Sequence, residues 1–551
     1  MSFQGESHEL GHVSQVKAIR PHVEEAPSSA GRRDLDREQL EKLGKKSVLK
    51  RNFRFLTILG FSCAVLVTWE GATITYGLGL KNGGPAGLIY GFIFIWIGNI
   101  SVFATLCELI SIAPTCGGQY HWVAMLAPKS SSKFLSYITG WLTLAGWQGA
   151  AASSGFFNGK MIQGLIIFLS ATYQPENWHA VMLLWLVILI VLVMNTVISS
   201  MLPKIEGVVL ILHIVGFFAV LITLFTFGQR QDAASVFVEF NNGGNWSSQA
   251  LSVFVGLAGC AYSFAGVDCS FHMCEEVENP SAAVPRSIMT SVLINGAMGL
   301  SMIIALLYGT TDLEKAMEST TGYPFMEIFY QATGSVGGTA AMICLVIFMS
   351  VCCTVGLVAA TSRMCWAFSR DRGLPFWRAL SKVGTWTCVP VWAIAATSLI
   401  SCLLGLITLG SKVVFEALVS VTISGLYSSY LIAAILLLYR RCGKGYKDPD
   451  PSVLPDLVST ASGQGQELAW GPWHIPGVAG IVNNAFACVF LSVTLFFSFW
   501  PPQTPVEPET MNFCVLVTGG VVLFSTAYYL AYARHAYKGP IREVHDDFAE
   551  E

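Results

Sequence analysis

Twelve long apolar segments constrain the fold of this 551-residue chain more than any other feature. As an α-helix, a segment of about 20 residues spans the roughly 30 Å hydrocarbon core of a bilayer. Charged residues make up only 12% of the chain, against about 25% in an average soluble domain. These features exclude a soluble fold and predict an all-α polytopic protein with twelve transmembrane helices in a lipid bilayer. The predicted spans are residues 55–80, 86–113, 135–169, 179–201, 205–227, 249–273, 287–309, 334–367, 389–409, 413–438, 475–499 and 512–532.

The distribution of Lys and Arg predicts the orientation, because cytoplasmic connections carry an excess of positive charge. Of the 32 Lys and Arg residues, 27 lie on one side when alternate connections are counted, and 11 of these precede residue 55. The opposite side carries Lys81, Arg230, Lys315 and Lys412. Both termini are therefore predicted to be cytoplasmic. Asn245, in an Asn-Trp-Ser triplet, would then lie on the outer side of the membrane. The triplet is either a glycosylation site or a chance match to the acceptor pattern.

Polar and Gly-containing stretches interrupt the first and the sixth predicted helix. Residues 68–73 (Thr-Trp-Glu-Gly-Ala-Thr) interrupt helix one near its middle, and residues 262–268 (Tyr-Ser-Phe-Ala-Gly-Val-Asp) interrupt helix six. In transporters built from inverted repeats, discontinuous helices at corresponding positions of the two halves meet near the membrane midplane around the substrate. The offset of five helices therefore predicts a core of two five-helix inverted repeats, followed by two C-terminal helices.

This interpretation divides the chain into six parts. They are a cytoplasmic tail at 1–54, disordered up to about Arg33; a first repeat at 55–228; a second repeat at 229–438; a cytoplasmic loop at 439–475; two helices at 476–534; and a cytoplasmic C-terminal tail at 535–551.

Two carboxylates lie at the predicted breaks, Glu70 in helix one and Asp268 in helix six. An ionised group near the bilayer centre costs about 2.5–3.5 kcal/mol on insertion scales, so both are candidates for a function. Asp268 is the candidate proton-coupling residue, and the alternative is that it caps helix six or pairs with an Arg. Glu70 is predicted to attract an ammonium group. The alternative is a protonated Glu70 that is hydrogen-bonded to a neighbouring helix.

The candidate substrate-binding residues surround the two breaks. Unwound backbone exposes N–H and C=O groups that bind the charged ends of an amino acid or amine. Aromatic side chains can form a wall around an ammonium group, although packing is their commoner role in membrane spans. Gln148 in helix three is expected to form a hydrogen bond either to the substrate or to a neighbouring helix. The candidates are Trp69, Glu70, Gly71, Ala72, Trp147, Gln148, Tyr262, Phe264, Ala265 and Gly266.

Other polar and small residues favour structural roles. His213 is interpreted as a hydrogen-bonded core histidine rather than as a ligand. The Gly residues at 140, 146, 149, 155 and 159 are expected to let helices approach closely. The connection from Glu275 to Arg286 is expected to cap helix seven with Pro285 at the start of that helix. The alternative is a gate latch held by carboxylate–Arg contacts.

Several classes of protein are excluded. The chain shows no metal-ligand spacing, no nucleophile elbow and no phosphate-binding loop, which argues against an enzyme and implies no cofactor. A net charge of −3 without a basic patch outside the tails argues against a nucleic-acid binder. The 15 cysteines lie mostly in apolar runs without a C-x-x-C pair and are interpreted as small hydrophobic residues.

Several motifs together resemble one family of transporters. They are residues 40–44 (Leu-Glu-Lys-Leu-Gly), 50–53 (Lys-Arg-Asn-Phe), 82–85 (Asn-Gly-Gly-Pro), 113–122 (Ala-Pro-Thr-Cys-Gly-Gly-Gln-Tyr-His-Trp), 146–148 (Gly-Trp-Gln) and 275–286. The chain resembles the fungal amino acid/choline transporter family, which includes 4-aminobutyrate and choline permeases, within the amino acid, polyamine and organocation superfamily. The resemblance extends from about Asp34 to Arg534.

The resemblance implies a twelve-helix, LeuT-like fold and alternating-access transport of amino acids, 4-aminobutyrate, choline, polyamines or related amines. A proton gradient is the implied driving force. Residues 262–268 are similar to the helix-six segment of arginine/agmatine antiporters of the superfamily, which implies substrate contact for Tyr262 and proton sensing for Asp268. Residues 69–72 depart from the Gly-Ser-Gly type of break that the superfamily has in helix one.

The expected location is the plasma membrane, with a vacuolar or other endomembrane as the alternative. Two other functions stay open. One is an exporter or exchanger of an amine-bearing, alkaloid-like metabolite, and the other is a sensor that binds an amino acid without transporting it.

Overall fold

The computed structural model describes residues 29–384, 388–409, 414–443, 446–447, 468–508, 510–541 and 543. In this part of the chain, nine helices are long and apolar enough to cross a membrane, and two shorter apolar helices accompany them. Apart from the parallel pairing of β1 (Tyr446–Lys447) with β2 (Leu468–Ala469), the described regular structure is helical. The all-helical class predicted from the apolar segments is confirmed.

Helices occupy every one of the predicted apolar segments. In chain order they are α2 (Phe55–Leu66), α3 (Thr68–Ile74) and α4 (Tyr76–Lys81) in the first segment, then α5 (Gly84–Ile112), α7 (Lys129–Leu169), α8 (Asn177–Thr196), α9 (Leu202–Phe227), α11 (Gln249–Tyr262) with α12 (Cys269–His272), α13 (Pro280–Gly309), α16 (Val336–Arg370), α18 (Val391–Leu406), α19 (Val414–Cys442), α20 (Gly477–Ser498) and α21 (Cys514–Tyr528).

Short helices connect these elements at the two ends of the bundle. They are α1 (Ser29–Lys42), α6 (Gln119–Leu126), α10 (Ala233–Phe237), α14 (Leu313–Met317), α15 (Pro324–Thr333), α17 (Trp377–Leu380), α22 (Arg534–Ala536), the 3₁₀ turns η1 (Ser199–Met201), η2 (Cys274–Glu276) and η3 (Ile407–Leu409), and the π-helical turn η5 (Tyr529–Ala533).

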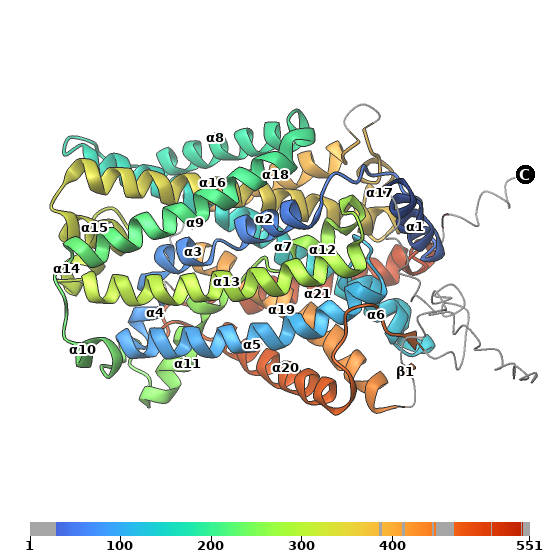
Figure 1. The fold of residues 1–551 in the computed structure, drawn as a ribbon. Helices are drawn as coiled ribbons and strands as arrows, with labels where there is room; N and C mark the ends of the chain where they lie inside the picture. Colours follow the sequence, from blue (N-terminus) through green and yellow to red (C-terminus); the bar gives the residue numbers. More distant parts are fainter. Residues whose placement is uncertain are drawn as a thin grey trace, which may run out of the picture.

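The long helices lie side by side along one common direction (Figure 1). The helices α1, α6 and α17 gather at one end of the bundle, and α10, α14 and α15 gather at the other (Figure 1). Glu543, the last described residue, lies at the end that holds α1, since its N–H donates to the carbonyl of Gly44 at 2.7 Å. The described parts that precede helix one and follow the last helix therefore share one end.

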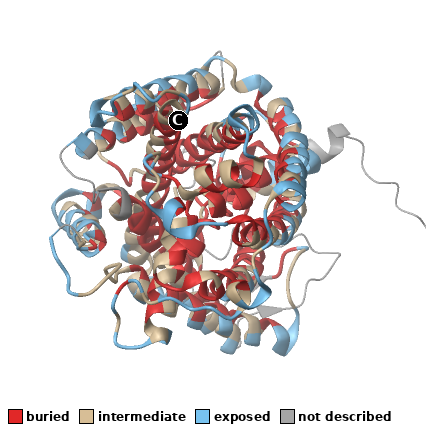
Figure 2. Ribbon diagram, turned by 90° about the vertical axis from the view of Figure 1, so that its left-hand side faces the viewer, coloured by how far each residue is buried: buried red, intermediate tan, exposed pale blue. Residues whose placement is uncertain are grey.

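The interior of the bundle is buried and its outer rim is exposed (Figure 2). Many of the exposed side chains are large and apolar, including Ile211 on α9 at 61% exposure and Leu516 on α21 at 71%. A water-soluble protein rarely exposes apolar surface of this extent. Such an outer surface matches a hydrocarbon environment, where helices satisfy their own backbone groups.

Two elements near the end that holds α1 begin earlier than expected. The helix α1 begins at Ser29, whereas the sequence placed the end of the disordered part at about Arg33, and disorder of the tail stays a prediction. Arg37 lies 3.7 Å from carboxylates three and four positions away, which supports this helix. Pro285 does not start helix seven but lies inside α13, which begins at Pro280. A Pro at the first helical position has no N–H to leave unsatisfied, so Pro280 fits the start of the helix.

Residues 1–28 of the predicted tail, and most of the predicted loop at 439–475, lie outside the described residues. The described part of that loop shows that α19 continues to Cys442, four residues beyond the predicted span.

Glycines bring α7 close to its neighbours, as the Gly stripe predicted. A Cβ added to Gly146 would lie 2.7 Å from the backbone nitrogen of Leu426 on α19. A Cβ added to Gly159 would lie 2.6 Å from the backbone oxygen of Ala180 on α8. No side chain fits at these positions without moving a backbone, so glycine sets the spacing of three helices.

Gly146→Ala is expected to destabilise the folded protein, because overpacking against a backbone costs about 1–3 kcal/mol. Gly519→Ala on α21 is the control, since no atom of the described residues lies within 4 Å of a Cβ added there. Thermal unfolding of the purified protein in detergent measures both variants. Equal melting temperatures for the two variants would contradict the close contact of α7 with α19.

Candidate functional site

Helix one is broken at Val67, between α2 and α3. Val67 has a left-handed backbone conformation (φ 33°, ψ 48°) that β-branched residues rarely adopt. Two side chains from other helices bind the backbone beside the break. Asn295 on α13 accepts from the N–H of Thr68 at 3.3 Å, and the thiol of Cys353 on α16 donates to the carbonyl of Val65 at 3.1 Å. The break is confirmed, but it precedes residues 68–73, which form most of α3.

Helix six is broken between α11 and α12, as residues 262–268 predicted. The chain turns from Ser263 to Asp268, and Gly266 adopts φ +98°, a conformation that favours glycine. The two broken helices meet, because the hydroxyl groups of Thr75 and Ser263 lie 3.3 Å apart. The Thr75 hydroxyl group also donates to the carbonyl of Gly71 at 2.9 Å.

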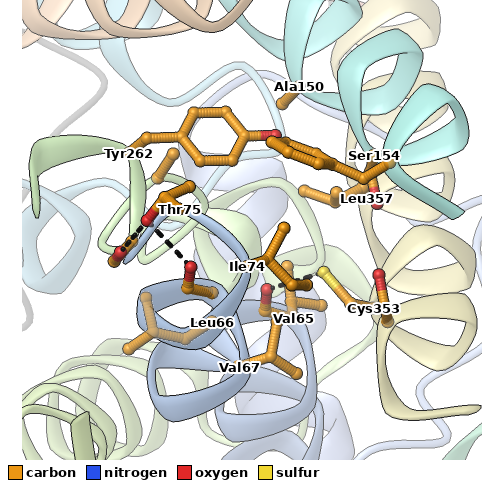
Figure 3. Close-up of a pocket in the computed structure, with 15 residues that line it drawn as sticks. Val65, Leu66, Val67, Ile74, Thr75, Ala150, Ser154, Tyr262, Cys353 and Leu357 are labelled. Atoms are coloured by element: carbon orange, nitrogen blue, oxygen red, sulfur yellow. Dashed lines mark hydrogen bonds between the residues drawn. The ribbon is translucent and has the colours of Figure 1, made fainter. Parts of the chain in front are cut away.

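A pocket with a cavity volume of about 50 Å³ lies between the two breaks. Figure 3 shows the ring of Tyr262 extending across it, with Thr75 and Ile74 facing this ring. The hydroxyl groups of Tyr262 and Ser153 lie 2.8 Å apart, which fixes the ring against α7. The pocket is lined by Val65, Leu66, Val67, Gly71, Ile74, Thr75, Ala150, Ser154, Phe157, Tyr262, Ser263, Ala265, Ser350, Cys353 and Leu357.

Three of the ten residues predicted to bind substrate line this pocket, namely Gly71, Tyr262 and Ala265. Tyr262 and Ala265 lie at the helix-six turn, and Gly71 lies within α3, directly after the helix-one break.

Four predicted residues of the two broken helices lie away from the pocket lining. Trp69 and Glu70 are fully buried and contact His213 on α9. Ala72 is buried, and Phe264 packs against Phe92 with ring centroids 5.2 Å apart.

The remaining three predicted residues also lie outside the lining. The Trp147 ring meets the ring of His272 edge-on, with centroids 5.4 Å apart. Gln148 donates to the carbonyl of Thr397 on α18 and borders a separate apolar cavity formed with α19 and α21. Gly266 supplies the turn of helix six and packs near Val65.

Sequence reasoning missed the contribution of α16 and of the polar face of α7. Ser350 and Cys353 line the pocket from α16, and Ser154 lines it from α7. The Ser154 hydroxyl group lies 2.7 Å from that of Thr354, which joins the two helices. The available signal was the group of small polar residues at 350–354 within an otherwise apolar span, which no helix break marked.

Asp268 is fully buried at the far side of the helix-six break, where neutral donors bind both of its oxygens. Tyr430 on α19 donates to Oδ1 at 2.5 Å, and Gln119 on α6 donates to Oδ2 at 2.8 Å. The Nε2 atom of His272 lies 3.6 Å from Oδ2. The described partners of Asp268 include no Arg, so the expected alternative of an Arg pair does not apply.

A group of ion pairs lies at the end of the bundle that holds α1. Arg370 of α16 donates to the two oxygens of Glu275 at 2.9 and 3.2 Å, and Arg363 donates to Glu276 at 2.9 Å. The segment before α2 joins the same place, because Phe53 donates to the carbonyl of Glu276 at 3.0 Å. The contacts expected for a gate latch are therefore present, and we call this group of ion pairs the end seal.

Residues from both ends of the chain extend the end seal. Lys45 forms a buried ion pair with Asp371, and the hydroxyl group of Tyr120 donates to Asp371 at 2.7 Å. The N–H of Ile541 also donates to Asp371 at 2.9 Å. Segments about 500 residues apart in the sequence thus bind one carboxylate.

The charges of the end seal shift the acidities of its carboxyl groups. Burial alone would raise the pKa of Glu275 and of Asp371. The guanidinium of Arg370 beside Glu275, and the ammonium of Lys45 beside Asp371, outweigh burial and lower both pKa values below their ordinary range. Both carboxyl groups are therefore ionised at neutral pH.

Comparison with known proteins identifies the family. A family model described as amino acid permease matches residues 53–522. The chain belongs to the amino acid permease family. This permease is 31% identical to a choline transporter of Saccharomyces cerevisiae, over 90% of its own length and 83% of that protein. It is 30% identical to an amino acid/polyamine transporter of Macrophomina phaseolina, over 83% and 96%, and 28% identical to the amino-acid permease BAT1 of Arabidopsis thaliana, over 93% and 97%.

The resemblance drawn from the sequence motifs is confirmed. The family and these relatives are transporters, not enzymes. Together with the apolar helices, they make the permease an integral, multi-pass membrane protein. Within the described residues, no group of three or more His, Cys, Asp or Glu side chains is arranged to hold a metal ion. Asn245 is exposed between α10 and α11, and its glycosylation stays a prediction.

Glu275→Gln is expected to destabilise the permease at neutral pH by roughly 2–4 kcal/mol, because it leaves Arg370 with a weakened buried pair. Since the pKa of Glu275 is lowered, its stabilisation is present above its ordinary value of 4.5 and is lost as the pH falls further. The difference in melting temperature between wild type and variant should therefore narrow below about pH 4.5. Glu318→Gln, at an exposed position after α14, is the control. A difference that stays constant down to about pH 3 would contradict the pairing.

Proposed function

We propose that the permease is a secondary active transporter of amino acids or small amines, and that the pocket between the two breaks is its substrate site. The observation that carries this proposal is the meeting of two broken helices at one pocket. Alternating access requires a central site that a moving bundle exposes first to one side and then to the other. The broken helices one and six are proposed to belong to that moving bundle, and the end seal is proposed to hold one side closed.

The pocket chemistry favours a solute with an ammonium group. The C-terminal ends of α2 and α11 both reach the pocket, and helix C-termini carry a partial negative charge. The described residues that line the pocket include no charged side chain, so no positive group in the lining would repel a cation. The rings of Tyr262 and Phe157, with centroids 5.6 Å apart, offer aromatic faces to an alkylammonium group.

The hydroxyl groups of Thr75, Ser154 and Ser350 are proposed to bind the other end of the solute. An amino acid, 4-aminobutyrate or choline combines an ammonium group with an oxygen-bearing end. Polyamines, which carry several ammonium groups, would have to place a second charge against these neutral hydroxyls.

The architecture proposed for this function is the twelve-helix arrangement of two five-helix inverted repeats plus two C-terminal helices. The end seal is proposed to face the cytoplasm, with both termini on that side, because the Lys and Arg excess lies there. The plasma membrane is the proposed location, where such a transporter would take up its solute.

A proton gradient is proposed as the driving force, with Asp268 as a coupling residue. When ionised, Asp268 binds donors from α6 and α19 at the same time. Protonation would replace one of these acceptor sites by a donor and weaken the contact between those helices. A coupled ion must bind one conformation better than the other, and this contact would supply that difference.

Uptake into proteoliposomes tests the substrate site. Radiolabelled amino acids, 4-aminobutyrate, choline and polyamines are screened with an inward proton gradient, using wild type and Gly71→Leu. The Cβ of a side chain at Gly71 would lie 3.6 Å from Ser263, an ordinary contact, so the larger side chain is expected to fill the pocket. Uptake should fall by roughly tenfold or more, which corresponds to about 1.4 kcal/mol or more of lost binding.

Gly207→Leu on α9 is the matched control, because the described part of the chain places no atom within 4 Å of a Cβ added there. Equal uptake by Gly71→Leu and Gly207→Leu would contradict the pocket as the substrate site. Failure of wild type to accumulate any of these solutes, despite saturable binding, would contradict transport itself and favour a sensor.

Asp268→Asn is expected to reduce proton-driven accumulation by roughly tenfold relative to solute exchange at equal pH. The variant should fold, because Oε1 of Gln119 has no partner among the described residues and a turned amide can pair with the new side chain. Parallel measurements of exchange and of gradient-driven accumulation give the ratio. Accumulation that follows the gradient as in wild type would contradict the role of Asp268.

A further inference from the structure

A buried polar cluster lies behind the helix-one break, on the side of α3 that faces α9 and α13. Glu70 and His213 have no exposed surface, and Glu70 Oε1 lies 2.8 Å from His213 Nδ1. Neither residue lines the pocket, whereas Val67 and Gly71 of the same segment do. The segment from Val67 to Gly71 therefore lies between the pocket and this cluster.

The hydrogen-bond geometry fixes the proton on one nitrogen of His213. Asn295 Nδ2 donates to the carbonyl of Ser291 at 3.1 Å, which orients the amide so that its Oδ1 faces His213 Nε2 at 3.1 Å. The same Oδ1 accepts from the N–H of Thr68. Because an amide oxygen can only accept, Nε2 of His213 must carry a proton.

The contact between Glu70 and His213 must then contain a second proton. Without it, the lone pair of Nδ1 would face a carboxylate oxygen at 2.8 Å, which is repulsive. Trp69 Nε1–H points to the same Nδ1 at 3.2 Å, so Nδ1 acts as an acceptor. This arrangement favours a neutral Glu70 carboxylic acid that donates its proton to Nδ1.

The described surroundings of Glu70 contain no other basic group that could compensate a negative charge on its carboxyl group. His213 is the only basic side chain within ion-pair distance of Glu70 in the described part of the permease. The titratable groups nearby are Cys63 on α2 and Cys352 and Cys353 on α16, none of which is a cation.

The other carboxyl group in this region is Glu206 on α9, which interacts with the same two α16 thiols. Glu70 Oε2 has no hydrogen-bond partner among the described residues and is fully buried. An ionised Glu70 beside a neutral His213 would leave an unpaired charge in the interior, which is strongly disfavoured.

The cluster is joined to the helix-one break. Thr68 is the first residue of α3, where the backbone N–H has no partner within the helix, and Asn295 accepts from it. His213 holds the same Asn295 oxygen from the other side. Loss of the shared proton would make Glu70 and His213 repel each other, and would move the start of α3 together with pocket residues Val67 and Gly71.

We propose that the Glu70–His213 pair is a proton-binding site of the permease that is distinct from Asp268. Release of the proton from this pair is coupled to a movement of the helix-one break. The proposal rests on the proposed transport function for its physiological meaning, but the proton itself is a property of the resting protein. The site binds one proton in the conformation described, and solute and proton should favour each other's binding by the same factor.

Infrared difference spectroscopy of the solute-free permease tests the site without relying on transport. Spectra recorded at neutral and at alkaline pH are expected to show a carboxylic-acid C=O band that disappears on alkalinisation. The band should be missing in Glu70→Gln and present in Asp268→Asn and in Glu239→Gln, an exposed carboxylate control. A spectrum of Glu70→Gln that equals that of wild type would overturn the proposal.

Proteoliposome transport then tests the coupling with whichever solute wild type accumulates. Glu70→Gln is expected to lower the ratio of proton-driven accumulation to equal-pH exchange by roughly tenfold, because the amide mimics the protonated acid and cannot release its proton. His213→Gln should lower the ratio in the same direction and serves as the second variant if Glu70→Gln does not fold. Unchanged ratios in the folded variants would overturn the coupling.

The two proposals fail in different ways. If wild type transports no solute but the Glu70 band is present, the proposed function fails and the proton site stands. If wild type transports and the band is absent, the site fails and the transport function stands.

Discussion

The absence of water inside a membrane-spanning bundle is the constraint on which the rest of this structure depends. Every backbone N–H and C=O group there needs a partner within the protein, and an unbroken helix supplies these partners by itself. The two helix breaks give up part of that self-sufficiency. The helix-one break is stabilised by side chains from α13 and α16, since Asn295 and Cys353 bind the backbone groups beside Val67. The breaks must therefore lie in the centre of the bundle, under other helices, and this position makes them available to form a pocket.

The same constraint gives α3 two different faces. Gly71 faces the pocket together with Tyr262 and the small polar residues of α16, and this lining is uncharged in the described residues. Glu70, one position earlier, faces α9 and is paired with His213. Solute chemistry and proton chemistry are thus separated by the width of one short helix, and a small rotation or shift of that helix changes both sides together.

The buried carboxyl groups of the end seal and those of the two broken helices have different partners. At the end where α1 lies, Glu275, Glu276 and Asp371 are paired with Arg or Lys, and in the two whose acidity is shifted these partners lower the carboxyl pKa. In the two broken helices, Glu70 and Asp268 have only His or neutral donors nearby. An adjacent guanidinium or ammonium favours the charged form of a carboxyl group, whereas a neutral donor brings no fixed positive charge.

The sequence by itself determined the helical class, the positions of the apolar helices and the turn at 262–268, because long apolar runs and clustered Gly and polar residues act locally along the chain. It also indicated the close packing at Gly146, since a residue without a side chain permits backbone contact whichever neighbour comes to it. Only the tertiary structure decided that Trp69 and Glu70 face His213 rather than the pocket, that α16 contributes Ser350 and Cys353, and that Arg370 binds Glu275. A helix buried on all sides has no polar face in its sequence to show which neighbour each residue meets. That information arises only when helices distant in the sequence pack together.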